Sequence, residues 1–217
     1  MVPERSAGWS LVVPVKVLAR AKSRLTGMDG TRRAELALAM AADTVAAVVG
    51  CPAVGAVIVV TDDPIAQAEL AGLGALVIGD EPAGGLNAAL TFGADYAQAH
   101  WPGCGRAGLA ADLPALTSAE LGRALAAARA WPQAFVPDAA GTGTTLYMAA
   151  AGAQFCPRFG LASRAAHQAH GAAELDIPAI AGLRRDVDTI ADLRLATAIG
   201  LGPRTSALAG PLLADLP

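Results

Sequence analysis

The side chains best suited to catalysis lie in two acidic clusters that are far apart in the sequence. Asp112 lies in residues 111–114, and Asp186 and Asp188 lie in residues 185–189. Both clusters follow apolar stretches typical of buried strands, and the strand ends of an open α/β sheet converge on one crevice. Carboxylate oxygens are preferred ligands of Mg²⁺. We therefore expect the three carboxylates to meet over a magnesium ion, with Asp112 and Asp188 as catalytic residues.

Each of these carboxylates also has a structural interpretation. Asp112 and Asp188 could instead cap the helices that follow them. However, a carboxylate at the end of an apolar strand needs a partner or a metal ion. Asp186 and Asp188 are two residues apart, so on an extended segment they share one face. For Asp62 and Asp63 we expect turn and capping roles rather than ligand binding.

A basic cluster follows the first apolar stretch of the chain. It contains Lys16, Arg20, Lys22 and Arg24. A phosphate-binding P-loop is excluded, because the glycines that let backbone N–H groups surround a phosphate are missing. A solvated basic loop is the structural alternative. Four cations directly after a buried strand favour binding of a triphosphate by these side chains, and we expect Lys22 to act in catalysis as well.

Three glycine-containing segments offer backbone and hydroxyl groups to a ligand. Residues 84–87 open a predicted helix and allow the close approach of a base or ribose. Residues 141–145 contain three hydroxyls and could receive an anion in a backbone nest. Residues 159–163 place Ser163 at a predicted helix N-cap, where a phosphate or a carboxylate can bind.

No Ser–His–Asp or Cys–His arrangement stands out in the sequence. His167 and His170 lie three apart on a predicted helix, but no third ligand accompanies them, which argues against a zinc site. A nucleophilic side chain is not required if the nucleophile is a phosphate oxygen, because the barrier then comes from charge repulsion and alignment. Metal ions and basic side chains lower that barrier, so the sequence indicates an enzyme that acts on nucleotides.

The apolar pattern predicts an α/β fold in a single domain that covers residues 1–217. A strand, a helix and a second strand come first, an order that favours parallel pairing in a central sheet flanked by helices. Expected extended segments are 10–15, 54–60, 75–78, 107–111, 134–137 and 183–187. Expected helices are 31–49, 65–71, 84–99, 118–130, 164–170 and 190–199, with Thr31 as the first N-cap and a capping box at 117–120.

The composition excludes several other classes of protein. The formal net charge of -3 gives no electrostatic footprint for nucleic acid. Cys51, Cys104 and Cys156 lie outside any CxxC pattern and are consistent with a reducing cytosol. No apolar run reaches the roughly 18 residues of a membrane span, and no signal peptide is recognisable. We expect a cytoplasmic protein with neither nucleic acid nor membrane as a partner.

Six blocks of the sequence, taken together and in order, resemble one known family. The blocks are 14–16 with 21–25, 85–90, 111–116, 138 with 141–144, 159–160 with 163 and 167, and 186–189. They are similar to the 2-phospho-L-lactate or phosphoenolpyruvate guanylyltransferases of coenzyme F-420 biosynthesis. The resemblance implies a Rossmann-like, nucleotide-diphospho-sugar-transferase-type fold. The implied reaction joins GMP from GTP to the phosphate of a three-carbon acid and releases pyrophosphate.

The resemblance also implies roles for individual residues and partners. Asp112 and Asp188 would hold magnesium with support from Asp186. Thr145, Gly160 and Ser163 would bind the small acid. Lys16, Lys22 and Arg24 would contact the triphosphate of GTP, and Gly85 and Asn87 the guanosine. The implied partners are GTP, the phosphorylated acid, a second copy in a homodimer, and a downstream deazaflavin transferase that receives the product.

Two alternatives remain open. Sugar-nucleotide pyrophosphorylases carry an LAAGxGxR loop after the first strand, whereas residues 15–20 read VKVLAR here. This departure weakens an assignment as a general sugar nucleotidyltransferase, and a molybdenum-cofactor nucleotidyltransferase is the related alternative. The second alternative is not an enzyme but a catalytically silent nucleotide-binding or scaffold protein. Such a protein would be expected to lack the carboxylates and cations that this sequence retains. Residues alone distinguish neither phosphoenolpyruvate from 2-phospho-L-lactate or 3-phosphoglycerate, nor guanine from another base.

Overall fold

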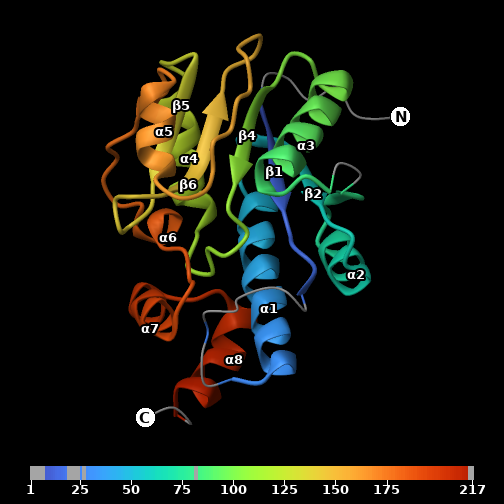
Figure 1. Cartoon of the computed structure of the whole chain (residues 1–217), viewed down its shortest axis with the longest axis vertical. Helices are drawn as coiled ribbons and strands as arrows, with labels where there is room; N and C mark the ends of the chain where they lie inside the picture. Colours follow the sequence, from blue (N-terminus) through green and yellow to red (C-terminus); the bar gives the residue numbers. More distant parts are fainter. Residues whose placement is uncertain (1–7, 19–24, 26–27, 81–82, 215–217) are drawn as a thin grey trace.

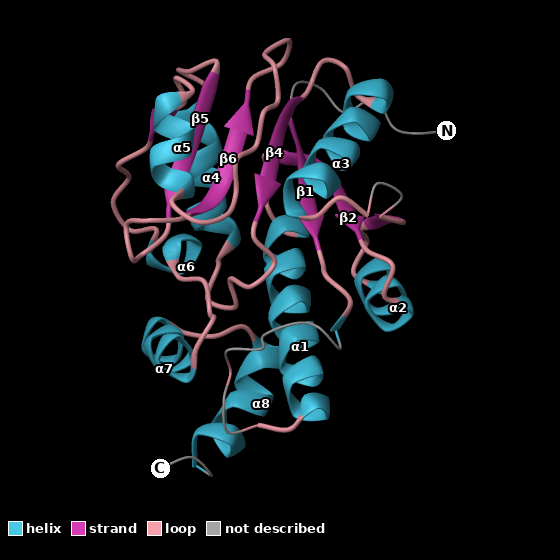
Figure 2. Ribbon diagram, in the orientation of Figure 1, coloured by secondary structure: helices cyan, strands magenta, loops and turns pink. Residues whose placement is uncertain are grey.

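A seven-stranded sheet forms the centre of the molecule (Figures 1 and 2). The computed structural model describes residues 8–18, 25, 28–80 and 83–214. The strand order is β3-β2-β1-β4-β6-β5-β7. The strands are β1 (Trp9–Pro14), β2 (Val54–Val60), β3 (Leu76–Ile78), β4 (Gly105–Leu109), β5 (Gln133–Pro137), β6 (Thr144–Ala149) and β7 (Ala173–Glu174).

The sheet is mostly parallel, as the sequence predicted. β1 pairs in parallel with β2 and β4, β2 with β3, and β5 with β7. β6 is antiparallel to both of its neighbours, β4 and β5. Since β1 and β4 are central and parallel, their carboxyl ends open at the same edge of the sheet, where ligands bind in folds of this type.

Helices cover both faces of the sheet (Figure 1). α1 and α4 pack on one face, with α2 beside them, and α3 and α5 pack on the other. α6, α7 and α8 follow the last strand, and α8 lies against α1. The helices are α1 (Gly30–Val49), α2 (Pro64–Gly72), α3 (Leu86–His100), α4 (Ser118–Ala128), α5 (Ser163–Ala169), α6 (Ala181–Arg184), α7 (Ile190–Ile199) and α8 (Pro203–Ala214).

Alternation along the strands divides the core between the two faces. In β1, Leu11 and Val13 pack towards α1, whereas Val12 packs towards α3, because successive side chains of a strand point to opposite faces. Gly93 lets α3 approach β1 closely, since a Cβ atom there would lie 2.5 Å from Cγ1 of Val12. The backbone of β1 is thereby fixed from both sides, and the segment that follows it leaves the sheet in a defined direction.

The structure corrects several local expectations. Residues 183–187 were expected to be extended, but α6 includes Leu183 and Arg184, and no strand follows it in the described chain. The N-cap of α1 is Asp29 rather than Thr31. The capping box at residues 117–120 is confirmed. α8 was not expected at all, since its apolar residues are mostly alanines and leucines without a clear period, and Pro211 lies inside it.

None of the helices in the described ranges combines the length and the apolar character needed to cross a membrane.

Candidate active site

A cavity of about 810 Å³ opens at the carboxyl ends of β1 and β4. Segments that are far apart in the sequence supply its walls: the end of β1, the segment after β4, the loop between β5 and β6, the start of α5, and the segment from α6 to α7. The lining includes Lys16, Asp112, Asp138, Thr144, Gly160, Ser163, Arg185, Asp186, Asp188 and Asp192. The strand-end crevice predicted from the sequence is therefore present, and both acidic clusters reach it.

The two acidic clusters are joined directly by a backbone hydrogen bond. The N–H of Val187 donates to the carbonyl oxygen of Asp112 over 3.1 Å. Val187 itself is fully buried, and its neighbours Asp186 and Asp188 both line the cavity. The expectation that these two carboxylates share one side is confirmed, although the segment is not part of a strand.

The pKa of Asp186 reflects its burial and the negative charges around it. Burial is the largest cause that raises the pKa of Asp186 to about 7, and the nearby carboxylates of Asp112, Asp138 and Asp188 contribute to the same rise. Each additional negative charge close by disfavours the ionised form of the carboxyl group. A cation placed among these side chains would remove that penalty.

Asp138 is a further carboxylate of the cavity that was quoted only as part of the family resemblance. Its Oδ1 accepts a hydrogen bond from Thr142 N–H at 2.9 Å, and its Oδ2 accepts one from Gly143 N–H at 2.8 Å. A Cβ atom on Gly143 would lie 2.3 Å from that Oδ2, so glycine is required there. The Asp-x-x-x-x-Gly spacing was the available sequence signal. Asp138 thereby fixes the loop between β5 and β6.

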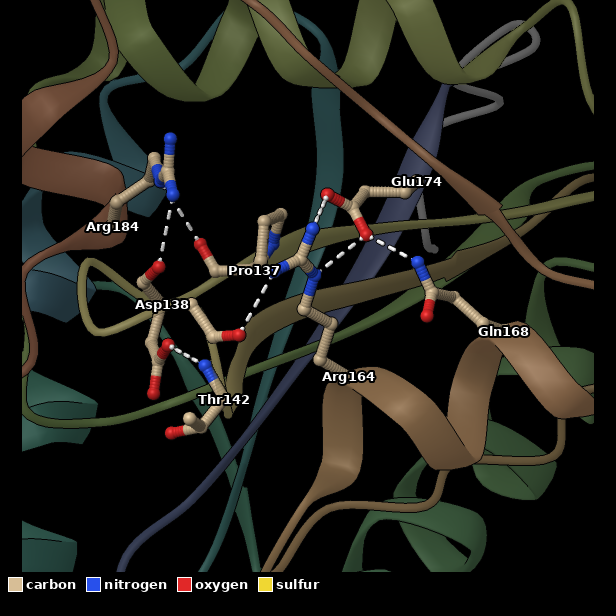
Figure 3. A network of polar contacts seen from close by, with 8 residues as sticks. Pro137, Asp138, Thr142, Arg164, Gln168, Glu174 and Arg184 are labelled. Atoms are coloured by element: carbon tan, nitrogen blue, oxygen red, sulfur yellow. Dashed lines mark hydrogen bonds and ion pairs between the residues drawn. The ribbon is translucent and has the colours of Figure 1, made fainter.

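Two arginines secure the same loop from outside (Figure 3). Arg184 donates to the carbonyl oxygens of Pro137 and Asp138 at 3.2 and 3.0 Å. Arg164 of α5 donates to Gly141 O and forms a two-pronged ion pair with Glu174 of β7, both of whose hydrogen bonds measure 2.8 Å. The network couples the loop to α5 and α6, so these elements hold one wall of the cavity together.

The residues predicted to bind magnesium fit a metal site in which substrate phosphates supply the remaining ligands. Within the described ranges, no three His, Cys, Asp or Glu side chains form a ready metal-binding group. Mg²⁺ is commonly held by only one or two carboxylates together with substrate phosphates. The all-oxygen donor set of Asp112, Asp186 and Asp188, and the raised pKa of Asp186, suit such a cation.

Part of the predicted basic site can be placed. Lys16 is exposed and lines the cavity after β1. Further along, Leu18 N–H donates to a carboxylate oxygen of Asp63 at 2.9 Å, and the other oxygen of Asp63 caps α2. The expected capping role of Asp63 is confirmed, with the added function of holding the chain after Lys16. Lys22 and Arg24 lie outside the described residues.

Two of the three residues predicted to bind the acid also line the cavity. Gly160 and Ser163 line the cavity. Thr145 is buried beside it without being part of the lining, and its Oγ1 has no hydrogen-bond partner in the described structure; its neighbour Thr144 does line the cavity. The N-cap of α5 is Ala162 in the left-handed conformation, so Ser163 is the first helical residue rather than the cap.

Asn87 has a positioning contact that the sequence did not reveal. Its Nδ2 donates to Phe159 O at 2.9 Å, and its Oδ1 accepts from Phe159 N–H at 2.8 Å. Neither Asn87 nor Gly85 belongs to the described lining of the cavity, whereas Leu86 does. Gly85 is the N-cap of α3 with φ of 88°, a value that favours glycine. Guanosine contacts by these two residues stay a prediction.

His167 anchors the same loop from inside the core. Its Nε2 accepts the N–H of Arg158 at 2.9 Å, so Nδ1 must carry the proton that faces Thr144 Oγ1 at 3.0 Å. The imidazole stacks on the rings of Phe135 and Tyr147, and burial lowers its pKa to about 4. His167 is therefore neutral at physiological pH. Apart from the place of His167 in the family resemblance, no sequence signal pointed to this role.

Solved structures with the same arrangement of elements define the fold class. A protein of Desulfovibrio desulfuricans G20 assigned to the nucleotide-diphospho-sugar transferases superposes with a TM-score of 0.70 at 17% identity, covering 96% of this chain and 95% of that chain. The CMP:2-keto-3-deoxy-manno-octonic acid synthetase complexed with CTP has a TM-score of 0.56 at 15% identity, over 89% and 98% of the two chains. The chain thus has a nucleotide-diphospho-sugar-transferase fold.

Sequence comparison narrows this class to one family. A family model described as "Guanylyl transferase CofC like" matches residues 9–174. The chain is 58% identical over 209 residues to the phosphoenolpyruvate guanylyltransferase of Thermomonospora curvata, covering 96% of this chain and 92% of the relative. It is 59% identical over 207 residues to the enzyme of that name from Streptomyces coelicolor, covering 94% and 97%. The chain belongs to the CofC-like guanylyl transferases, and it is a nucleotidyltransferase.

Proposed function

We propose that this enzyme transfers GMP from GTP to the phosphate of phosphoenolpyruvate and releases pyrophosphate. The observation that carries the proposal is the cavity, whose lining combines the carboxylates of Asp112, Asp186 and Asp188 with Gly160 and Ser163. The names of the relatives that are more than half identical over almost the whole chain support the same substrates. We infer that 2-phospho-L-lactate is the closest competing acid.

The reaction is an in-line displacement at the α-phosphorus of GTP. A phosphate oxygen of the acid forms the new P–O bond, and the bond to the bridging oxygen of the β-phosphate breaks, so pyrophosphate leaves with that electron pair. Both reactants are anions, so the protein must align them and offset their repulsion. Lys16, at the end of β1, brings one positive charge to the cavity.

Asp112, Asp186 and Asp188 are the residues that would hold Mg²⁺. When bound, the ion neutralises phosphate charge and polarises phosphoryl oxygens. The backbone bond from Val187 to Asp112 keeps the two acidic segments at a fixed separation, so the carboxylates need little rearrangement to share a cation. We expect Lys22 and Arg24 to add positive charge on the side of the triphosphate.

The acid would be recognised by the loop that Asn87 and His167 hold in place. Ser163 is 2% exposed and lines the cavity at the start of α5, so its hydroxyl can donate to an anion, whereas its backbone N–H already donates to Gly160 O. The hydroxyl oxygen of Thr144 accepts a hydrogen bond from Nδ1–H of His167. The hydroxyl hydrogen of Thr144 is therefore available to donate to the acid. A small acid with one phosphate and one carboxylate offers few other atoms for recognition.

We further infer that the product serves coenzyme F-420 biosynthesis in the cytoplasm, where a deazaflavin transferase would consume it. The test is a pyrophosphate-release assay that crosses phosphoenolpyruvate, 2-phospho-L-lactate and 3-phosphoglycerate with GTP, ATP, CTP and UTP. We expect the largest kcat/KM with GTP and phosphoenolpyruvate, and no release after chelation of Mg²⁺. Preference for another base, or for an acceptor outside these acids, would overturn the assignment.

A further inference from the structure

Arg185 places a guanidinium in the cavity, beside the carboxylates. It follows α6 directly and lines the cavity together with Asp186, Asp188 and Asp192. Its side chain retains 24% of its exposure, so the group is partly enclosed and still accessible to a ligand. No role was expected for Arg185 from the sequence, in which it opens the second acidic cluster.

The hydrogen-bonding capacity of this guanidinium is not used by the described protein. Nε of Arg185 is buried and has no hydrogen-bond partner among the described residues. Nη1 lies 3.9 Å from Oδ1 of Asp192, which is an ion-pair distance but too long for a hydrogen bond. A buried donor without an acceptor costs free energy, and a ligand that supplies the acceptor recovers it.

Asp192 cannot easily turn towards Arg185, because it is committed to the start of α7. Its Oδ2 accepts from the N–H and the hydroxyl of Thr189 at 2.9 and 2.7 Å, completing a capping box with that residue. The preceding arginine behaves differently, since Arg184 uses its guanidinium on the backbone of the loop after β5. Two consecutive arginines therefore have separate roles, one within the protein and one in the cavity.

We propose that Arg185 binds a phosphate group of a substrate through Nε and a terminal nitrogen. Arginine presents these donors as a planar fork that matches two phosphate oxygens, which a lysine cannot do. The identity of the phosphate rests on the proposed function: it belongs either to GTP or to the acid, and the chemistry of the contact is the same. In both cases Arg185 offsets anionic charge close to the carboxylates that would hold Mg²⁺.

Calorimetry on Arg185→Met and Arg185→Lys tests this contact. Each variant and the wild type are titrated separately with GTP, phosphoenolpyruvate and inorganic pyrophosphate, with and without Mg²⁺. We expect Arg185→Met to weaken one of the two substrates by roughly 10- to 100-fold, and the affected substrate identifies the source of the phosphate. Arg185→Lys should restore little of the affinity. Arg129→Met, on the exposed C-cap of α4, is the matched control and should bind as the wild type does.

Three results would overturn the proposal. They are wild-type affinity of Arg185→Met for every ligand, full recovery in Arg185→Lys, or a loss of urea stability in Arg185→Met without a change in binding. The last two would mean that Arg185 only balances the charge of its carboxylate neighbours. If Arg185→Met fails to fold, the lysine variant decides the question. If the wild type binds pyrophosphate but turns over GTP with none of the acids, the proposed function is refuted. The binding test of Arg185 still applies in that case.

Discussion

At the scale of single residues, Asp112 and Asp188 are the most direct test of the site. Replacing either by asparagine keeps its size and removes its charge, and an amide is a poorer ligand for Mg²⁺ than a carboxylate. We expect Asp112→Asn and Asp188→Asn each to lower kcat by at least about 100-fold, on the order of 3 kcal/mol of transition-state stabilisation. Pyrophosphate release measures the loss.

The control for this pair is Asp95→Asn on the exposed side of α3, which should keep wild-type activity. Circular dichroism of all variants must show a folded protein, because a lost structural contact would also abolish turnover. A folded variant with near-normal kcat would remove that residue from the proposed metal site.

His167 makes stability depend on pH. Burial lowers its pKa in the folded protein to about 4, and the charges of Arg158 and His170 act in the same direction. The contribution of the neutral ring is complete above pH 6.5, the ordinary value. As the pH falls towards 4, the unfolded chain binds a proton that the folded protein does not, so the free energy of unfolding decreases by up to about 3 kcal/mol. Below that pH this group causes no further loss.

Urea unfolding of the wild type and of His167→Gln between pH 4 and 8 measures this dependence. The glutamine variant should be less stable at pH 7 and should lack the part of the pH slope that comes from His167. His100→Gln is the control, since His100 is an exposed histidine on a different helix, α3, and the slope of this variant should retain the part that comes from His167. Equal slopes for all three proteins would mean that folding does not lower the pKa of His167.

At the scale of elements, the loop before α5 is held by α3 through Asn87. The paired hydrogen bonds to Phe159 place Gly160 at the cavity, and Gly160 has φ of 135°, where a side chain would be strained. We expect Asn87→Ala to weaken phosphoenolpyruvate binding about tenfold and to lower the free energy of unfolding by about 1–3 kcal/mol, since two backbone groups lose their partners.

Calorimetry separates this role from the predicted contact with guanosine. Weaker binding of the acid with unchanged binding of GTP indicates that Asn87 positions the loop. Weaker binding of GTP alone would favour the nucleotide role instead. Gln98→Ala, further along α3, controls for general effects of a substitution on this helix.

At the scale of the whole molecule, α8 packs against α1, and α1 contributes Ala37 and Ala41 to the lining of the cavity. Asp43 of α1 is 5% exposed, and its carboxylate accepts from Arg204 N–H and Thr205 N–H at 3.2 and 2.7 Å, so it caps α8 from a distant part of the chain. A Cβ atom on Gly202 would lie 2.4 Å from Cγ of Asp43, which requires glycine there.

We expect Asp43→Ala to lower the free energy of unfolding by about 2 kcal/mol, because a helix cap and two buried donors are lost together. Asp29→Ala removes the exposed cap of α1 and should cost about 0.5–1 kcal/mol. Urea denaturation at pH 7 measures both. A smaller effect for Asp43 than for Asp29 would mean that α8 contributes little to the stability of the rest of the protein.

Local sequence determined β1 to β5, most helices and the residue types of the site, whereas β6 and β7 were not among the expected extended segments. Alternating apolar residues specify β1 and β2, and the pairing of Thr117 with Glu120 specifies the start of α4, because these signals act over a few residues. The carboxylates at 112, 186 and 188 could likewise be chosen from the sequence, since each follows an apolar stretch, where a charged group needs a ligand or a partner. That these carboxylates lie close together was expected from the fold class, because the strand ends of an open α/β sheet meet in one crevice.

Tertiary structure alone decided which groups face the cavity and which serve the scaffold. Arg184 and Arg185 are identical in sequence terms, yet one bonds to the loop after β5 and the other lines the cavity. Asn87 pairs with a residue 72 positions away, and Asp43 caps a helix that begins about 160 positions later. Such contacts depend on the packing of separate elements, and no local pattern records them, because a side chain's partner is set by what the fold brings beside it.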